Sequence, residues 1–253
     1  MWLVLAFSLT ITLLMRYVLM DSTDPENSKI LYILPLTCIF LIPTLHRTVM
    51  PERFVEHYGG GTWFKAAFLH TFTFLALSFL LVNPPFGDIA APELASKWTV
   101  VADDGEELAY PHSMATSGAT LTWYTEGSPI LEGEAWLLFG LMDNVNSDGA
   151  VVEVTREYQA NETIREDNIS YWNSNAERIA NGTSTSNKSA PNLTPHGDLD
   201  QPFSVYLGTD LEEGTHKIVV KITEEGDPWK NVQRYTWNLV ISSESAVQDS
   251  MSE

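Results

Sequence analysis

The chain has 253 residues, a formal net charge of −19 at pH 7 and a single cysteine, Cys38. One cysteine excludes an intramolecular disulfide and a thiolate metal site within one chain. Residues 1–84 carry five acidic and five basic side chains, so the whole negative excess lies in residues 85–253. A surface this acidic repels nucleic acid and anionic lipid headgroups, which argues against both as partners of the second half.

The first 84 residues contain three apolar runs, at residues 2–20, 30–45 and 62–82. A membrane-spanning helix needs about 20 apolar residues, and the first and third runs meet that length. The second run is short and contains two prolines, which membrane helices tolerate. No basic residue precedes the first run and no small-residue cleavage motif follows it, so a cleaved signal peptide is not expected. The sequence therefore predicts an anchor of three transmembrane helices over residues 1–84.

The loops between these runs predict the orientation of the anchor. Loop 21–29 is acidic, whereas loop 46–61 carries Arg47 and Arg53. The positive-inside rule places the second loop in the cytoplasm. We therefore expect a plasma-membrane protein with a cytoplasmic N-terminus and a C-terminal domain outside the cytoplasm.

Two polar residues interrupt the apolar runs. Arg16 lies near the outer end of the first run, where we expect its head to reach the interface by snorkelling. The alternative is a charged partner, but the other two runs contain no Asp or Glu. His70 lies in the middle of the third run, where a hydrogen bond to a Ser or Thr of a neighbouring helix is expected. The alternative is a functional role for His70, because ionisable residues within membrane helices often belong to functional sites.

A linker over residues 85–96 leads to a region with strand character. Alternating apolar residues and turn signals give seven candidate strands, at residues 98–102, 120–125, 135–142, 151–158, 203–207, 216–223 and 235–241. About seven short strands predict an all-β antiparallel sandwich over residues 97–243. Residues 244–253 form an expected disordered tail.

The last two candidate strands also carry a resemblance. The stretch GTHKIVVKITEEGD, followed by YTWNLVI, resembles the end of the Ig-like PKD modules of archaeal and bacterial surface proteins. The acidic composition and dense glycosylation sequons are similar to those of archaeal membrane-anchored surface proteins. The resemblance implies an Ig-like fold and a role in display or binding.

Residues 160–201 interrupt the strand pattern as an insertion. Ile169, Trp172, Ala176 and Ile179 have helical spacing, which predicts one amphipathic helix packed on the sandwich. The Ser/Thr/Asn-rich tract that follows, up to Pro195, is expected to be mobile. Disorder of the whole insertion is the alternative.

The insertion holds five N-x-S/T acceptor sequons, at Asn161, Asn168, Asn181, Asn187 and Asn192. The expected topology places all of them outside the cytoplasm, where glycosylation occurs. The sequon positions and the loop charges thus favour the same orientation, and glycosylation of these residues is a prediction.

Catalytic patterns are not recognised in the sequence, because the six histidines occur singly and no nucleophile motif or metal-ligand spacing is found. We expect no enzyme activity and no cofactor. The open alternative is calcium, because Asn144, Asn146 and Asp148 resemble the start of a calcium loop, although a polar hairpin turn is the default between two strands. Trp229 lies in a turn, where exposure and contact with a partner are the alternative to packing in a core.

The sequence therefore predicts a non-enzymatic, membrane-anchored surface protein. Its glycosylated sandwich would bind a partner or support an envelope assembly, and its partners would be membrane lipid and other membrane or envelope proteins. The alternative is an accessory subunit of a membrane transporter or of a membrane-bound enzyme complex.

Overall fold

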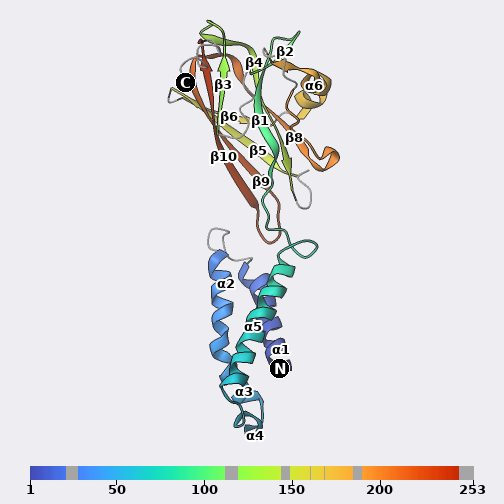
Figure 1. Cartoon of the computed structure of the whole chain (residues 1–253), viewed down its shortest axis with the longest axis vertical. Helices are drawn as coiled ribbons and strands as arrows, with labels where there is room; N and C mark the ends of the chain where they lie inside the picture. Colours follow the sequence, from blue (N-terminus) through green and yellow to red (C-terminus); the bar gives the residue numbers. More distant parts are fainter. Residues whose placement is uncertain are drawn as a thin grey trace. The chain divides into compact units, whose positions relative to one another are not determined.

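The structure is a computed structural model that describes residues 1–20, 28–111, 119–143, 149–159, 161–167, 169–184 and 190–244. The chain divides into two compact units (Figure 1). The helical unit comprises Met1–Ala90 and Glu225–Lys230, and the β unit comprises Ala91–Glu224 and Asn231–Glu253. A short segment from the second half of the sequence is thus part of the helical unit.

The helical unit is built from α1 (Trp2–Leu14), η1 (Met15–Leu19), α2 (Ser28–Thr37), η4 (Cys38–Leu41), α3 (Ile42–Val49), α4 (Glu52–Val55) and α5 (Gly60–Leu81). Among the described residues, two helices are long and apolar enough to cross a membrane, Trp2–Leu19 and Gly60–Leu81. The middle run forms a shorter apolar helix, Ile33–Val49. Pro35 lies inside α2 and Pro43 in the first turn of α3, and proline interrupts the hydrogen bonding of a regular helix.

Buried hydroxyl groups in the helical unit bond within their own helices. The hydroxyl groups of Thr12 and Ser78 donate to the carbonyl oxygens of Ser8 and Phe74, one turn earlier in each case, and the Ser8 hydroxyl lies 2.8 Å from the Val4 carbonyl oxygen. Such bonds satisfy a polar side chain in an apolar environment without a partner molecule. Apolar clusters around Phe74 and around Ile42 fill the space between the helices.

The β unit contains, in its described part, β1 (Glu93–Asp103), β2 (Leu108–Tyr110), β3 (Thr120–Tyr124), β4 (Ile130–Met142), β5 (Val151–Tyr158), β6 (Asn161–Glu166), β7 (Thr183–Ser184), β8 (Gln201–Glu212), β9 (Gly214–Glu224) and β10 (Asn231–Ser242). These strands form two five-stranded sheets, in the orders β7-β2-β1-β4-β8 and β3-β10-β9-β5-β6. A short 3₁₀ turn, η5 (Gly197–Leu199), precedes β8.

One apolar core is shared by both sheets. Inward residues of β1, β4 and β8 pack against those of β3, β5, β9 and β10. Trp98 of β1 and Trp237 of β10 stack at the centre, with ring centroids 4.7 Å apart and an angle of 6°. The alternating apolar residues that predicted the strands are therefore the residues that fill the space between the two facing sheets.

All seven candidate strands of the sequence are present, but the pairing is not purely antiparallel. β3 pairs with β10 in parallel, and β2 pairs with β7 in parallel. In each parallel pair the two strands are far apart in the sequence, which leaves the long connection that parallel pairing requires. The expectation of an antiparallel sandwich is corrected to a β-sandwich with mixed sheets, and β2, β6 and β7 are strands that the sequence did not predict.

The insertion contains α6 (Ile169–Asn181), which confirms the predicted helix. Trp172 and Ile179 pack against the sheet as expected, whereas Ile169 and Ala176 are exposed and Tyr171 packs there in addition. Together with residues 190–194, α6 covers a second apolar cluster on the outer face of the β1–β4 sheet. That cluster consists of Val101, Leu108, Tyr110, Trp136, Leu138, Ile179 and Leu193.

The tract expected to be mobile up to Pro195 is packed where the structure describes it. Leu193 is only 3% exposed, and a Cβ on Gly140 of β4 would lie 2.2 Å from its carbonyl oxygen. A backbone this close to a strand requires glycine at the point of contact. The expectation was wrong here because one buried leucine attaches a tract whose composition is otherwise polar.

Candidate functional site

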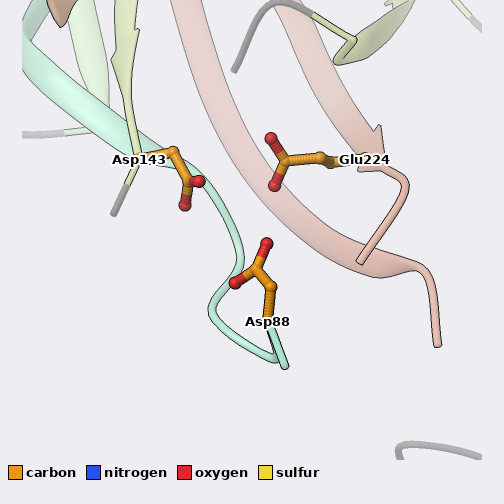
Figure 2. A group of neighbouring side chains, drawn as sticks. All are labelled: Asp88, Asp143 and Glu224. Atoms are coloured by element: carbon orange, nitrogen blue, oxygen red, sulfur yellow. The ribbon is translucent and has the colours of Figure 1, made fainter. Parts of the chain in front are cut away.

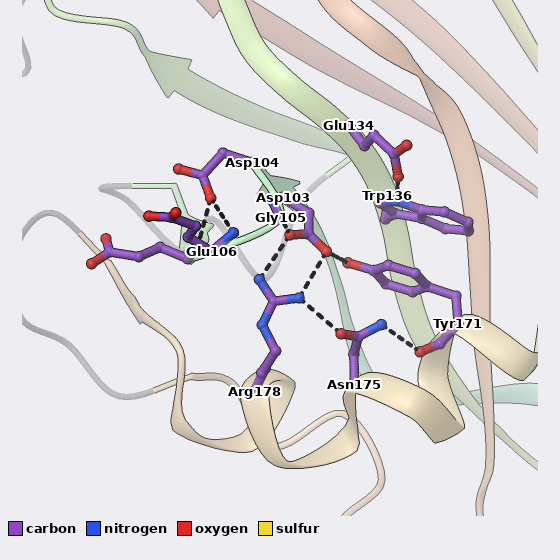
Figure 3. Close-up of polar contacts among 10 residues, drawn as sticks. Asp103, Asp104, Gly105, Glu106, Glu134, Trp136, Tyr171, Asn175 and Arg178 are labelled. Atoms are coloured by element: carbon purple, nitrogen blue, oxygen red, sulfur yellow. Dashed lines mark hydrogen bonds and ion pairs between the residues drawn. The ribbon is translucent and has the colours of Figure 1, made fainter.

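A polar network centred on Asp103 joins α6 to the end of β1 (Figure 3). Arg178 donates from Nη2 to Oδ1 at 2.8 Å and from Nη1 to Oδ2 at 3.1 Å, which is a bidentate ion pair. The Tyr171 hydroxyl donates to Oδ2 at 2.8 Å, and the Gly105 N–H donates to Oδ1 at 2.9 Å. Asn175 accepts a further bond from Arg178 at 2.8 Å.

These contacts determine the charge of Asp103. Burial alone would raise the pKa of the carboxyl group, but the hydrogen bonds from Arg178, Gly105 and Tyr171 outweigh burial and hold the pKa below its usual range. The same contact raises the pKa of Arg178, and burial together with Asp103 raises the pKa of Tyr171. All three groups therefore keep their ordinary charge at neutral pH.

An aromatic stack extends the network over the sheet. The Tyr171 ring lies on Trp136 of β4, with centroids 3.8 Å apart and an interplanar angle of 6° (Figure 3). The Trp136 indole N–H donates to Glu134 Oε2 at 3.1 Å. The network thus positions α6 on the sheet, and because Asp103 already accepts from four donors, it is suited to holding α6 rather than to transferring a proton.

Beside α6 lies a groove of about 340 Å³, which is the candidate binding surface of the β unit. One side is formed by Trp172, Ala176, Ile179 and Ala180 of the helix, and the other by residues 190–194. The lining is largely apolar, with Asn192 and Thr194 as polar groups. Such a surface suits contact with an apolar or aromatic group of a partner.

The sequons fall partly within the described residues. Asn161, Asn181 and Asn192 are exposed, as an acceptor for glycosylation must be. Asn168 and Asn187 lie outside the described residues. Glycosylation at these positions stays a prediction.

The calcium candidates Asn144, Asn146 and Asp148 also lie outside the described residues. Asp143, the residue before these candidates in the sequence, follows the end of β4. Glu224 ends β9 and is 4% exposed (Figure 2). Carboxylate oxygens of these two residues lie within 4.8 Å of each other. Asp88, also drawn in Figure 2, belongs to the helical unit, where its backbone pairs with Asp227. An acidic pair is common without a metal, so we assign no ion to it.

Trp229 is not exposed as the sequence suggested. It is half-buried and packs against the cluster of Met15, Met20, Phe74 and Val82 in the helical unit. The turn that carries it belongs to the same unit, which the sequence could not indicate. A partner contact at Trp229 stays a prediction.

Arg16 corrects the expectation of snorkelling. Its side chain is 2% exposed and forms an ion pair with Asp227 at 2.6 Å. It also donates to the carbonyl oxygens of Leu81 and Phe86, at 3.0 and 3.3 Å. The acidic partner of Arg16 is therefore Asp227, which lies in the turn between β9 and β10 and not in an apolar run.

His70 joins three helices of the helical unit. Its Nε2 donates to the carbonyl oxygen of Pro35 in α2 at 3.1 Å, and its Nδ1 lies 2.8 Å from the Ser8 hydroxyl of α1. The expected hydrogen bond to a Ser or Thr of another helix is therefore confirmed. Its polar atoms are occupied within the chain, which fits a structural role.

The sequence missed the Asp103–Arg178 pair, because 75 positions separate the two residues. The only signal was Arg178 on the polar side of a predicted helix. The position of Asp103 at the end of a strand carries no hint of its partner, since long-range pairing is set by the fold.

No family model and no curated protein matches this chain. Among solved structures, the chain is similar to the CooA pilin subunit from enterotoxigenic Escherichia coli. The two are 13% identical over 59% of this chain and 99% of the pilin, with a TM-score of 0.19. A similarity this low carries no argument about fold or function.

Proposed function

We propose that this chain is a non-enzymatic, membrane-anchored surface protein whose outer β-sandwich binds a partner or supports an envelope assembly. The supporting observation is that two unlike units share one chain: membrane-length apolar helices in one, and a β-sandwich with the acidic excess in the other. An apolar helix pair of this kind suits a bilayer, and an acidic sandwich suits water.

Three spans, with the N-terminus in the cytoplasm, are part of the proposal. The stretch Ile33–Val49 would be the third span, shortened by its prolines, and its neighbouring segments would complete the crossing. Arg47 and Arg53 would lie in the cytoplasm, and the sequons outside it. The Ig-like character of the sandwich and its glycosylation belong to the same proposal.

The polar side chains of the helices favour an anchor over the alternative, an accessory subunit of a transporter or of a membrane-bound enzyme. Ser8, Ser78, His70 and Arg16 have hydrogen-bond partners within this chain. Polar groups that hold a partner helix would instead be directed outward. The partner surface is then expected on the β unit, where Trp172 lines the groove beside α6.

Two experiments test this function. Protease added to intact cells should release a soluble fragment that begins near the linker at residues 85–96, whereas protection of the β unit would overturn the topology. Cross-linking on intact cells should then join the β unit to another envelope protein, and Trp172→Ala should weaken that cross-link relative to Trp229→Ala. Cross-links confined to the helices would favour the accessory subunit.

A further inference from the structure

A cavity of about 580 Å³ lies in the helical unit, between α3, α4 and the start of α5. Its lining consists of Arg47, Glu52, Val55, Glu56, Tyr58 and Trp63. Pockets for small organic ligands typically measure about 300–1,000 Å³. The volume is therefore sufficient for a small ligand.

The aromatic wall of this cavity is formed by rings that pack against one another. Tyr58 and Trp63 meet edge to face, with ring centroids 5.3 Å apart and an angle of 74°. His46 supports both rings from behind, at 5.8 and 5.7 Å, and is only 4% exposed. The His46 Nδ1–H donates to the Ile42 carbonyl oxygen at 3.0 Å, which fixes the imidazole.

Charges of both signs line the same cavity. Glu52 and Glu56 are one helical turn apart, joined by a bond from the Glu56 N–H to the Glu52 carbonyl oxygen at 3.0 Å, so they share one side. The ion pairs found among the described residues do not include Arg47, Glu52 or Glu56. Both the guanidinium and the carboxylates are thus available to a ligand that carries a negative and a positive group.

We propose that this cavity binds the phosphoethanolamine headgroup of a zwitterionic phospholipid. The fork of Arg47 donates to the phosphate oxygens, and Glu52 and Glu56 accept from the ammonium group. The rings of Tyr58 and Trp63 favour the same cation. A choline headgroup lacks the N–H donors that the carboxylates need, and a glycerol headgroup lacks the cation.

The position of the cavity agrees with a lipid ligand. Trp63 lies in the first turn of α5, and Tyr58 lies two residues before that helix begins. If α5 spans the bilayer, both aromatic residues lie at a membrane–water interface, where Trp and Tyr are enriched. The inference therefore rests on the proposed membrane anchor, which the protease experiment tests separately.

Native mass spectrometry of the full chain tests the site. The protein in mild detergent is mixed with equal amounts of phosphatidylethanolamine, phosphatidylcholine and phosphatidylglycerol with the same acyl chains. We expect preferential retention of phosphatidylethanolamine and a loss of about tenfold in Arg47→Gln, the scale of one charged hydrogen bond. The matched control is Arg53→Gln, in the same loop but outside the cavity lining, which should bind like the unmodified chain.

The double variant Glu52→Gln, Glu56→Gln should abolish the preference for phosphatidylethanolamine over phosphatidylglycerol. Arg47→Lys, which keeps the charge and loses the fork, should fall between Arg47→Gln and the unmodified chain. Equal retention of the three lipids, or equal losses in the Arg47 and Arg53 variants, would overturn the proposal.

Free phosphoethanolamine separates the two sources of this headgroup. If it raises the melting temperature of the lipid-free protein, and Arg47→Gln removes that effect, the headgroup alone fills the cavity. If only the phospholipid binds, the acyl chains contribute and the ligand is a lipid. Either result supports the cavity as the site, provided that the preference for phosphatidylethanolamine is observed.

Discussion

Arg16 and Asp227 form an ion pair at 2.6 Å. The side chain of Arg16 is only 2% exposed, whereas that of Asp227 is 64% exposed. The pair joins the end of the first helix to the turn between β9 and β10, and both residues belong to the helical unit. A buried cation with an exposed partner retains some contact with water through that partner, which lowers the cost of its burial.

Replacing Asp227 with Asn should lower the stability of the helical unit by about 1–2 kcal/mol. Loss of one partner of a fully buried pair costs about 3–5 kcal/mol, and the exposure of Asp227 reduces that effect. Thermal melts of the full chain in detergent measure the change. The control is Glu225→Gln in the same turn, whose exposed pair with Lys230 should contribute little.

Replacing Gly140 with Ala should destabilise the β unit by about 2 kcal/mol, within the range for overpacking. The added Cβ would meet the Leu193 carbonyl oxygen at 2.2 Å and push residues 190–194 off the sheet. Denaturant unfolding checks this result against Gly149→Ala, where nothing lies within 4 Å of the new Cβ. Equal stability of the two variants would mean that residues 190–194 are not packed.

The ion pair of Asp103 with Arg178 should make the β unit sensitive to acid. Because the pKa of Asp103 is held below its usual range, its contribution is present above about pH 4 and is lost as the pH falls through the lowered pKa. Melts between pH 7 and pH 2 should show this loss. Asp103→Asn should be less stable at neutral pH and lose less in acid, whereas the exposed control Asp198→Asn should follow the unmodified chain.

His216 should add a second, milder acid sensitivity. It is fully buried, its Nε2–H donates to the Glu212 carbonyl oxygen at 2.8 Å, and Arg156 donates to its Nδ1 at 3.2 Å. Burial lowers its pKa, so the unfolded chain binds the proton first as the pH falls below about 6.5. Stability should then fall by up to about 1.4 kcal/mol per pH unit until the lowered pKa is reached.

Melts between pH 8 and pH 5 measure this effect. His216→Gln should remove the pH dependence in that range at a cost in stability, while His196→Gln should preserve it. A pH dependence that survives the loss of His216 would assign it to another group.

His70→Phe should cost the helical unit about 1 kcal/mol, the usual scale for hydrogen bonds between membrane helices. The change removes the bonds to Ser8 and to the Pro35 carbonyl oxygen. His57→Phe is the control, because His57 is exposed and its ring bonds only to the Arg53 carbonyl oxygen of its own turn. Detergent melts that do not distinguish the two variants would contradict the joining role of His70.

The elements that the sequence predicted are those with a strong local pattern. Ile218, Val220 and Ile222 of β9 alternate, and all three are fully buried in the core. β2 and β7 are three and two residues long, too short for such a pattern. Their existence depends on pairing with distant segments.

The candidate site was predicted less well, for the same reason. The spacing of the insertion indicated the helix and the packing of Trp172, which also lines the groove, but it did not indicate that Tyr171 stacks on Trp136. Neighbours on a helix differ by about 100° in direction, so Tyr171 and Trp172 meet different parts of the surface that the helix covers. The partner of Arg16 could not be found locally, because it lies in a turn near the other end of the chain.

The Arg16–Asp227 pair also sets an order of events during synthesis. Arg16 leaves the ribosome roughly two hundred residues before Asp227. At about 5–20 residues per second, the helix that carries Arg16 exists for roughly 10–40 s without its carboxylate. The carbonyl oxygens of Leu81 and Phe86, made 65 and 70 residues after Arg16, become available to the guanidinium earlier than the carboxylate of Asp227. The helix that carries Arg16 therefore acquires its full set of contacts only after most of the β unit has been made, and a chain released before residue 227 would retain an unneutralised cation in its anchor.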